Sequence, residues 1–233
     1  MAQMAQTTPT PGPGADTGAN TGTGATTGGG ATTGTRDRIV VAAARLLQRQ
    51  GYVGTGIKQI AKDAQATLGS VYHFFPGGKE AVAVAAIAYS GEEFAVLLRE
   101  ALSSVEDPGA AIEACTAELA TGLRESGWID GCPVTAAALE TLGTESEIQR
   151  ACAAALGGWE RLVEEKLLGA GFDAADAREL ATTVISALEG AEVTAQVNRT
   201  EEPLRMVGRQ MARLIGTYGN EGARDAGTAA AGR

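Results

Sequence analysis

The chain of 233 residues is 44% apolar but only 4% aromatic, and it has a formal net charge of −9. These values indicate an Ala- and Leu-rich soluble protein with a helical core. The sequence has no run of 18 apolar residues, and its first residues, MAQMAQTTPTPGPG, lack both positive charge and an apolar segment. It therefore predicts neither a membrane span nor a secretory signal, and it favours a cytoplasmic protein without a membrane partner.

The first 34 residues consist almost wholly of Thr, Gly, Ala and Pro. Such a segment has too little apolar surface to offset the entropy lost on ordering, which predicts a disordered tail over residues 1–34. No Lys or Arg precedes Arg36, so this tail is not expected to bind DNA.

Three short helices are expected between residues 35 and 80. The first spans about residues 36–50 and ends at Gly51. The second carries apolar residues at i, i+3, i+4 and i+7, namely Ile57, Ile60, Ala61 and Ala64. Thr67 is placed to cap a third helix, which must end before Pro76. Two short helices joined by a tight turn predict a helix-turn-helix DNA-binding domain over residues 35–80.

The third of these helices suits a DNA groove better than a catalytic pocket. Its small residues Gly69 and Ser70 allow its first turn to approach base edges, while Tyr72, His73 and Lys79 are donors for phosphates. The alternative is that the tyrosine and the histidine only complete a small helical core. The residues predicted to contact double-stranded DNA are Thr55, Lys58, Thr67, Leu68, Gly69, Ser70, Tyr72, His73 and Lys79.

The distribution of charge along the chain favours DNA binding by this domain. Between Thr35 and Glu80 there are seven basic and three acidic side chains, a formal charge of +4, which leaves −13 for the other residues. Attraction to phosphate is local, because it is screened beyond about 10 Å at 0.1 M salt. An acidic body therefore does not exclude a basic DNA-binding head.

This segment resembles the N-terminal domain of TetR-family transcriptional repressors. The residues at the family's spacing are Ala44 to Gly51, Thr55, Ile60-Ala61, Gly69-Ser70-Val71-Tyr72-His73, Phe75-Pro76 and Lys79-Glu80. The later Gly131-Cys132-Pro133-Val134 is similar to the LmrA/YxaF-like branch. The sequence departs from the family pattern at three positions, with Gln65 where the turn usually has Gly, Gly56 in place of a second Thr or Ser, and Gly78 in place of a capping Ser.

The rest of the chain is predicted to be helical as well. Helices are expected over about residues 79–102, 111–125, 134–142, 145–168, 174–197 and 200–218, with Asp173 as the cap of the fifth of them. Together they predict a helical ligand-binding and dimerisation domain over residues 81–218, followed by a flexible tail over residues 219–233. No strand-like alternation occurs, so the predicted fold class is all-α.

The body is interpreted as a receptor for a small molecule and as a dimerisation module. The predicted pocket consists of Phe94, Leu98, Leu119, Leu123, Trp128, Leu139 and Trp159. A fully packed core is the alternative, and it is the family resemblance that favours a pocket. The resemblance also implies a homodimer formed by the last two helices, with Ile185, Leu188, Ala191, Val207, Met211 and Ile215 at the interface; an ordinary monomer core is the alternative.

An enzyme is not expected. The single histidine, His73, lies in the predicted DNA-binding helix, which leaves no histidine for a hydrolytic triad. The three cysteines, Cys115, Cys132 and Cys152, form no CxxC pair and are interpreted as core residues, with a thiol sensor at Cys132 as the alternative. No metal site and no cofactor are predicted.

The sequence thus predicts a TetR-like repressor that binds a pseudo-palindromic operator as a homodimer and is released by a small apolar or aromatic effector. Two alternatives stay open. One is a DNA-binding regulator without ligand control, and the other is a helical small-molecule-binding protein without operator recognition.

Overall fold

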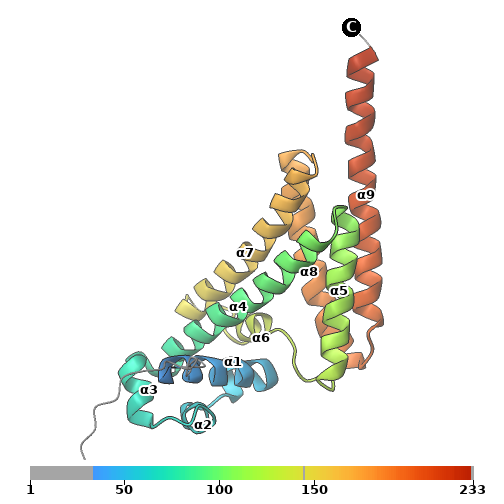
Figure 1. The fold of residues 1–233 in the computed structure, drawn as a ribbon. Helices are drawn as coiled ribbons and strands as arrows, with labels where there is room; N and C mark the ends of the chain where they lie inside the picture. The colour runs from blue at the N-terminus through green and yellow to red at the C-terminus, as the bar shows by residue number, and fades with distance from the viewer. Residues whose placement is uncertain (1–33, 144, 232–233) are drawn as a thin grey trace, which may run out of the picture. The chain divides into compact units, whose positions relative to one another are not determined.

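A computed structural model describes residues 34–143 and 145–231, and this part of the chain contains nine α-helices and no strand (Figure 1). The all-α prediction is therefore confirmed. Apart from Gly34, the predicted tail of residues 1–34 lies outside the described residues. The helices are α1 (Thr35–Gly54), α2 (Ile57–Asp63), α3 (Leu68–Phe74), α4 (Gly78–Ser104), α5 (Pro108–Glu125), α6 (Pro133–Glu140), α7 (Glu147–Gly169), α8 (Ala174–Asn198) and α9 (Glu202–Ala231).

Helices α1, α2 and α3 form the head of the molecule around a small shared core. Ile39 and Leu47 from α1, Ile60 from α2 and Val71 from α3 are almost completely buried. Thr67 caps α3 as predicted, since its hydroxyl oxygen accepts a hydrogen bond from the Ser70 backbone N–H at 3.0 Å. The helix-turn-helix arrangement follows directly from these apolar and capping positions.

Two positions in the head have left-handed backbone conformations. Gly51 interrupts α1 with φ 70°, and a Cβ there would collide with the Glu140 carboxylate of α6. Gln65 has φ 51° in the turn between α2 and α3. A residue with a Cβ is strained in this conformation. This explains why the family pattern usually has glycine at this turn, where this chain has glutamine.

Helix α4 lies in the core of the body. It is long and apolar enough to cross a membrane by length and composition alone. However, residues such as Ile87 and Leu98 are completely buried, because α4 packs against α7, α1 and α5 (Figure 1). Its apolar character is that of a helix covered by other helices.

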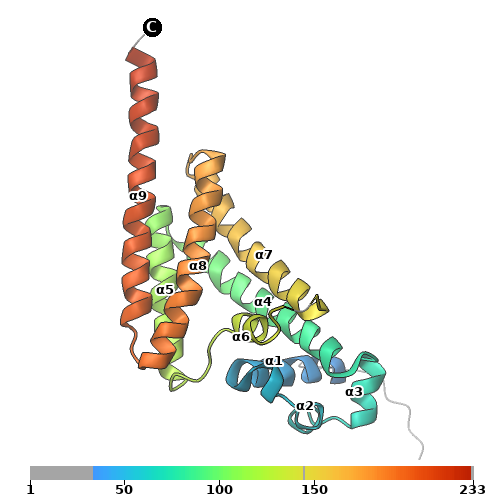
Figure 2. The same cartoon turned by 180° about the vertical axis from the view of Figure 1, so that it is seen from behind.

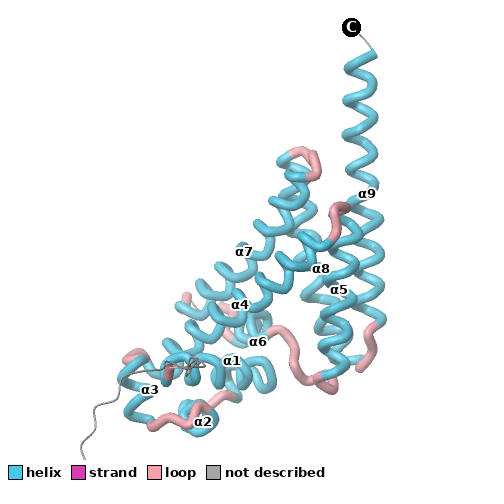
Figure 3. The backbone as a smooth tube through the Cα atoms, viewed as in Figure 1, coloured by secondary structure: helices cyan, strands magenta, loops and turns pink. Residues whose placement is uncertain are grey.

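Helices α5, α8 and α9 lie side by side, and α7 connects this group to α4 (Figure 2). The longest connection between helices is the loop of residues 126–132, which joins α5 to α6 (Figure 3). The sequence predicts a flexible tail after Tyr218, but α9 continues as a helix to Ala231. The chain beyond Gly219 has no proline and is rich in alanine, and the helix continues through Gly222 and Gly227.

Candidate nucleic-acid interface and internal cavity

The candidate DNA-binding surface is the outer face of α3. Leu68 and Tyr72 are 38% and 50% exposed, and Gly69 and His73 are exposed beside them. The Thr67 and Ser70 hydroxyls lie 2.9 Å apart at the beginning of this helix. Backbone N–H groups and hydroxyls at a helix N-terminus, together with an exposed tyrosine on the same helix, are suitable donors for phosphates and base edges.

Two of the predicted DNA contacts are engaged elsewhere. Thr55 is only 2% exposed, and its hydroxyl donates to the Gly51 carbonyl oxygen at 2.6 Å, so it closes the end of α1 and is not available to DNA. Lys79 is half-buried, with its ammonium 4.3 Å from the centre of the Tyr52 ring and 3.4 Å from the Val53 carbonyl oxygen. Lys58, by contrast, is exposed on α2. The sequence identified the right motif but could not separate its exposed polar side chains from its structural ones.

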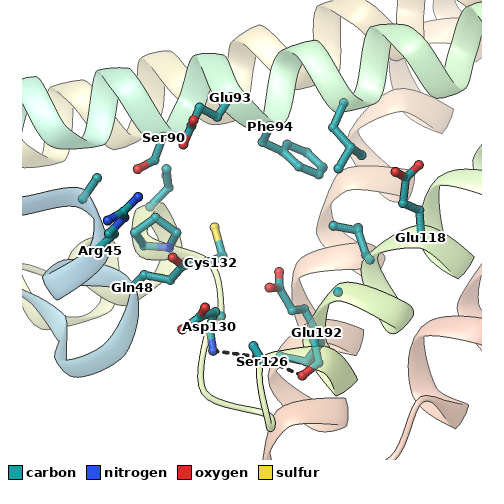
Figure 4. A pocket seen from close by; sticks show the side chains of 18 of the residues that line it. Arg45, Gln48, Ser90, Glu93, Phe94, Glu118, Ser126, Asp130, Cys132 and Glu192 are labelled. Atoms are coloured by element: carbon teal, nitrogen blue, oxygen red, sulfur yellow. Dashed lines mark hydrogen bonds between the residues drawn. The ribbon is translucent and has the colours of Figure 1, made fainter. Parts of the chain in front are cut away.

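A cavity of about 620 Å³ lies between the head and the body (Figure 4). It is lined by side chains from α1, α4, α5, α6, α7 and α8 and by the loop before α6. Phe94 and Trp159 stand edge to face at one wall, with ring centres 4.6 Å apart, and the Trp159 indole N–H donates to the Gly91 carbonyl oxygen at 2.9 Å. These two rings provide the apolar wall expected of a small-molecule site.

The structure brings together four of the seven predicted pocket residues, which are Phe94, Leu119, Leu123 and Trp159. The other three are not in the lining of this cavity. Leu98 is completely buried in the core, Leu139 is 60% exposed on the short helix α6, and Trp128 packs with a separate cluster around Leu204. Helical periodicity indicates the apolar side of each helix but not which helix will cover it, which is why these three residues lie outside the lining.

Acidic residues are the feature of the cavity that the sequence did not suggest. The lining contains one arginine, Arg45, and six carboxylic acids, which are Glu93, Glu118, Glu125, Asp130, Glu189 and Glu192. Burial and the neighbouring Glu189 carboxylate raise the pKa of Glu192 to about 8. The only signal in the sequence was the i, i+3 spacing of two glutamates within the otherwise apolar pattern of α8.

The three cysteines are buried or half-buried thiols. Burial raises the pKa of Cys115 to about 12, and burial together with the Glu189 and Glu192 carboxylates raises the pKa of Cys132 well above 9. A thiol that stays protonated is a poor nucleophile, so the cavity environment argues against a thiol sensor at Cys132.

The predicted dimer interface needs a correction at the level of residues. Ile185, Leu188, Ala191 and Ile215 are buried within the single chain, and Val207 and Met211 are half-buried there. The reason is that α7 and α9 pack on α8, and α5 packs along α9, so helices of the same chain cover most of the apolar faces that the sequence assigned to a partner subunit. Gly208 illustrates this, because a Cβ at this position would collide with the Thr116 side chain of α5.

Two polar contacts join the head to the part of the body around the cavity. Arg49 of α1 forms an ion pair with Asp130, a cavity residue, at 3.0 Å. Glu140 at the end of α6 accepts a hydrogen bond from the Val53 backbone N–H at 2.8 Å. Both contacts are exposed, so they contribute little stability, but they tie the position of α1 to that of α6 and the preceding loop.

Comparison with known proteins agrees with this architecture, a helix-turn-helix regulator with a helical body. Residues 39–86 match the bacterial regulatory proteins of the tetR family, and residues 108–210 match the C-terminal domain of the LmrA/YxaF-like transcriptional regulators. The chain is 33% identical over 181 residues to the HTH-type transcriptional regulator YxaF of Bacillus subtilis, covering 78% of this chain and 95% of that protein. It is 35% identical over 170 residues to the HTH-type transcriptional regulator LmrA of the same organism, covering 73% and 90% respectively.

Among solved structures, the regulatory protein TetR from Rhodobacter sphaeroides is similar, with a TM-score of 0.67 and 26% identity over 77% of this chain and 97% of that one. The chain therefore belongs to the TetR family of DNA-binding transcriptional regulators, and its body is of the LmrA/YxaF-like type. Its relatives are regulators and not enzymes, as predicted from the lack of catalytic residues.

Proposed function

We propose that the protein is a cytoplasmic repressor that binds a pseudo-palindromic operator as a homodimer and releases it when a small effector with an apolar or aromatic body occupies the cavity. The observation that carries this proposal is that the cavity is lined by α1 of the head as well as by α4 of the body. A ligand placed there touches both parts of the molecule at once.

The DNA-binding half of the proposal is supported by the exposed first turn of α3. A helix of seven residues presents only a few side chains to a groove, so one subunit alone offers little affinity. Two subunits related by two-fold symmetry read two half-sites about one helical turn apart, which gives both affinity and a palindromic preference.

The dimer is proposed to form through the outer faces of α8 and α9 and not through the residues predicted from the sequence. Val193 and Val197 of α8 and Met206 of α9 are large apolar side chains that are exposed in the single chain. Small residues, Ser186 and Gly190, are exposed near them on α8 and allow close approach of a second helix. A paired four-helix arrangement would cover these side chains.

Effector control is proposed to act on the spacing between α1 and α4. Arg45 and Gln48 line the cavity from α1, and Phe94 lines it from α4. The first turn of α4 holds Lys79, which contacts the end of α1. An effector that fits best when α1 and α4 are further apart stabilises a head position that does not match the two half-sites. Operator affinity then falls by the ratio of the effector's affinities for the DNA-incompetent and DNA-competent arrangements.

The experiment measures operator affinity in a variant whose cavity is filled from the head side. Gln48→Trp adds an aromatic ring to the cavity, and we expect it to weaken binding to duplex DNA from upstream of the gene at least about tenfold, or ~1.4 kcal/mol. Ala153→Trp is the control, since Ala153 is exposed on α7 and does not line the cavity. Fluorescence anisotropy with labelled duplex gives the affinities, and circular dichroism verifies the fold.

Two outcomes would contradict the proposal. If the wild-type protein shows no salt-dependent binding to its upstream DNA, operator recognition is absent and the protein is a small-molecule-binding protein of the same fold. If the wild type binds but Gln48→Trp binds equally well, the cavity does not control the head, and a regulator without ligand control is the correct description.

A further inference from the structure

Three side chains from two distant segments of the chain converge at one wall of the cavity. Cys132 lies at the beginning of α6, and Glu189 and Glu192 lie one turn apart on α8. The Cys132 Sγ and one carboxylate oxygen of each glutamate all lie within 4.8 Å of one another. Figure 4 shows Cys132 and Glu192 facing the same space.

Glu192 is the member of this group that is enclosed by protein without a polar partner among the described residues. Its carboxylate is deeply enclosed by protein, and the part of the side chain that stays accessible opens into the cavity. In the part of the chain that the structure describes, no hydrogen bond or ion pair reaches it, and Arg45, which lines the same cavity, forms no ion pair with either glutamate. An enclosed carboxylate beside a second carboxylate is costly unless it takes up a proton or a cation compensates the charge.

We propose that Cys132, Glu189 and Glu192 bind one divalent metal ion of the Zn²⁺ class. A thiolate and two carboxylates are ligands that Zn²⁺ accepts, and the thiolate favours Zn²⁺, Co²⁺ or Cd²⁺ over Mg²⁺ and Ca²⁺. Tetrahedral coordination, with Zn–S of about 2.3 Å and Zn–O of about 2.1 Å, places neighbouring ligand atoms roughly 3.5 Å apart. Side-chain rotations that draw the three groups together by about 1 Å therefore complete the geometry.

The surroundings of the three ligands support this assignment. The Thr135 hydroxyl donates to Oε2 of Glu189 and fixes the orientation of that carboxylate, as residues around a metal site commonly do. The Thr135 backbone N–H donates to the Cys132 sulfur from the first turn of α6, at 3.5 Å, and orients this second ligand.

The fourth coordination position would face the cavity, because all three ligands belong to its lining. A water molecule or a donor atom of an effector is able to occupy it, which is the arrangement of metal sites that keep one position open. Metal binding goes beyond the proposed regulatory function. It depends only on the three ligand side chains, so it can be present whether or not the cavity controls DNA binding.

The experiment titrates the full-length protein, stripped of metal with a chelator, with Co²⁺ and then with Zn²⁺ as competitor. We expect one Co²⁺ per chain with an absorption band from thiolate-to-metal charge transfer, which Zn²⁺ abolishes. Cys132→Ser should remove the band, and Glu192→Gln should weaken Co²⁺ binding at least about tenfold while keeping the band at saturating metal. Circular dichroism and the unfolding midpoint confirm that each variant is folded.

Two matched controls make the test specific. Cys115→Ser removes a buried thiol outside the cavity, and Glu118→Gln removes a cavity carboxylate outside the group of three, so both should bind Co²⁺ like the wild type. Absence of the band in the wild type at micromolar Co²⁺, or equal weakening in Glu118→Gln and Glu192→Gln, would overturn the proposal. Operator affinity, measured separately with and without Zn²⁺, reports on the regulatory function and leaves the binding result intact.

Discussion

The α3 surface and the cavity differ in how their residues are distributed along the chain. The α3 surface comes from one short segment, residues 67–74, in which helix capping and the apolar spacing determine which side chains are exposed. The residues that line the cavity come from six helices and one loop, and they are spread along the chain between residues 41 and 192. A short contiguous motif is readable from spacing and capping, whereas a site made of distant segments depends on which helix faces which.

Helix α8 carries one apolar residue that is buried in the chain and another that is exposed, so it separates core packing from subunit contact. Ile185 and Val193 both lie on α8, but the first is buried in the chain and the second is 43% exposed. We expect Ile185→Glu to unfold the subunit, at a cost of about 4 kcal/mol or more, because it places a charge in the core. Val193→Glu should leave the subunit folded and shift the dimer towards monomer.

Thermal unfolding and light scattering at micromolar concentration distinguish these two effects. A folded monomer from Ile185→Glu would mean that the face of α8 buried in the single chain is the true dimer interface. An unchanged dimer mass for Val193→Glu would mean that the outer face of α8 is free in the assembled protein.

Local signals account for most of the fold. Thr67 and Asp173 were predicted as caps, and in the structure each accepts a hydrogen bond from the backbone of its helix. Helix boundaries between residues 79 and 198 were predicted to within about three residues, because proline, glycine and capping side chains mark nearly every end. Helix α9 continues past Gly219, Gly222 and Gly227 to Ala231, so glycine alone does not mark its end.

Contacts between distant segments account for what the sequence did not predict. The acidic wall of the cavity requires residues 132, 189 and 192 to meet, and the i, i+3 spacing of the two glutamates does not indicate that residue 132 lies beside them. Most of the residues predicted for the dimer interface are buried within the single chain, because α5, α7 and α9 cover apolar faces of the kind that a partner subunit would cover. An apolar stripe on a helix has the same sequence pattern in both cases.

The head allows the same comparison between an exposed and a buried residue of one motif. Tyr72 is half-exposed on α3, while Thr55 is buried and bonded to Gly51. Tyr72→Ala should lower operator affinity at least about tenfold, with little change in the free energy of unfolding, because it removes a phosphate donor from the surface. Thr55→Val should lower the free energy of unfolding by about 1 kcal/mol, because the Gly51 carbonyl loses its partner, and it should leave operator affinity nearly unchanged.

Urea denaturation and anisotropy titrations at one fixed salt concentration measure both quantities for both variants. Equal losses of operator affinity would show that Thr55 reaches DNA despite its burial, contrary to the structural assignment. A loss of stability without loss of affinity in Tyr72→Ala would remove Tyr72 from the DNA-binding surface.

The smallest expected effect concerns the turn between α2 and α3, where the sequence departs from its family. Gln65 adopts φ 51°, a left-handed conformation in which a Cβ is unfavourable, so Gln65→Gly should raise the free energy of unfolding by about 0.5–1 kcal/mol. The gain is below the full strain because glycine also increases the entropy of the unfolded chain. Lys62→Gly, an exposed position in the regular part of α2, should instead lower the free energy of unfolding by about 1 kcal/mol. Urea denaturation of both variants tests the pair, since losses of the same sign and size would mean that Gln65 is not strained in the folded protein.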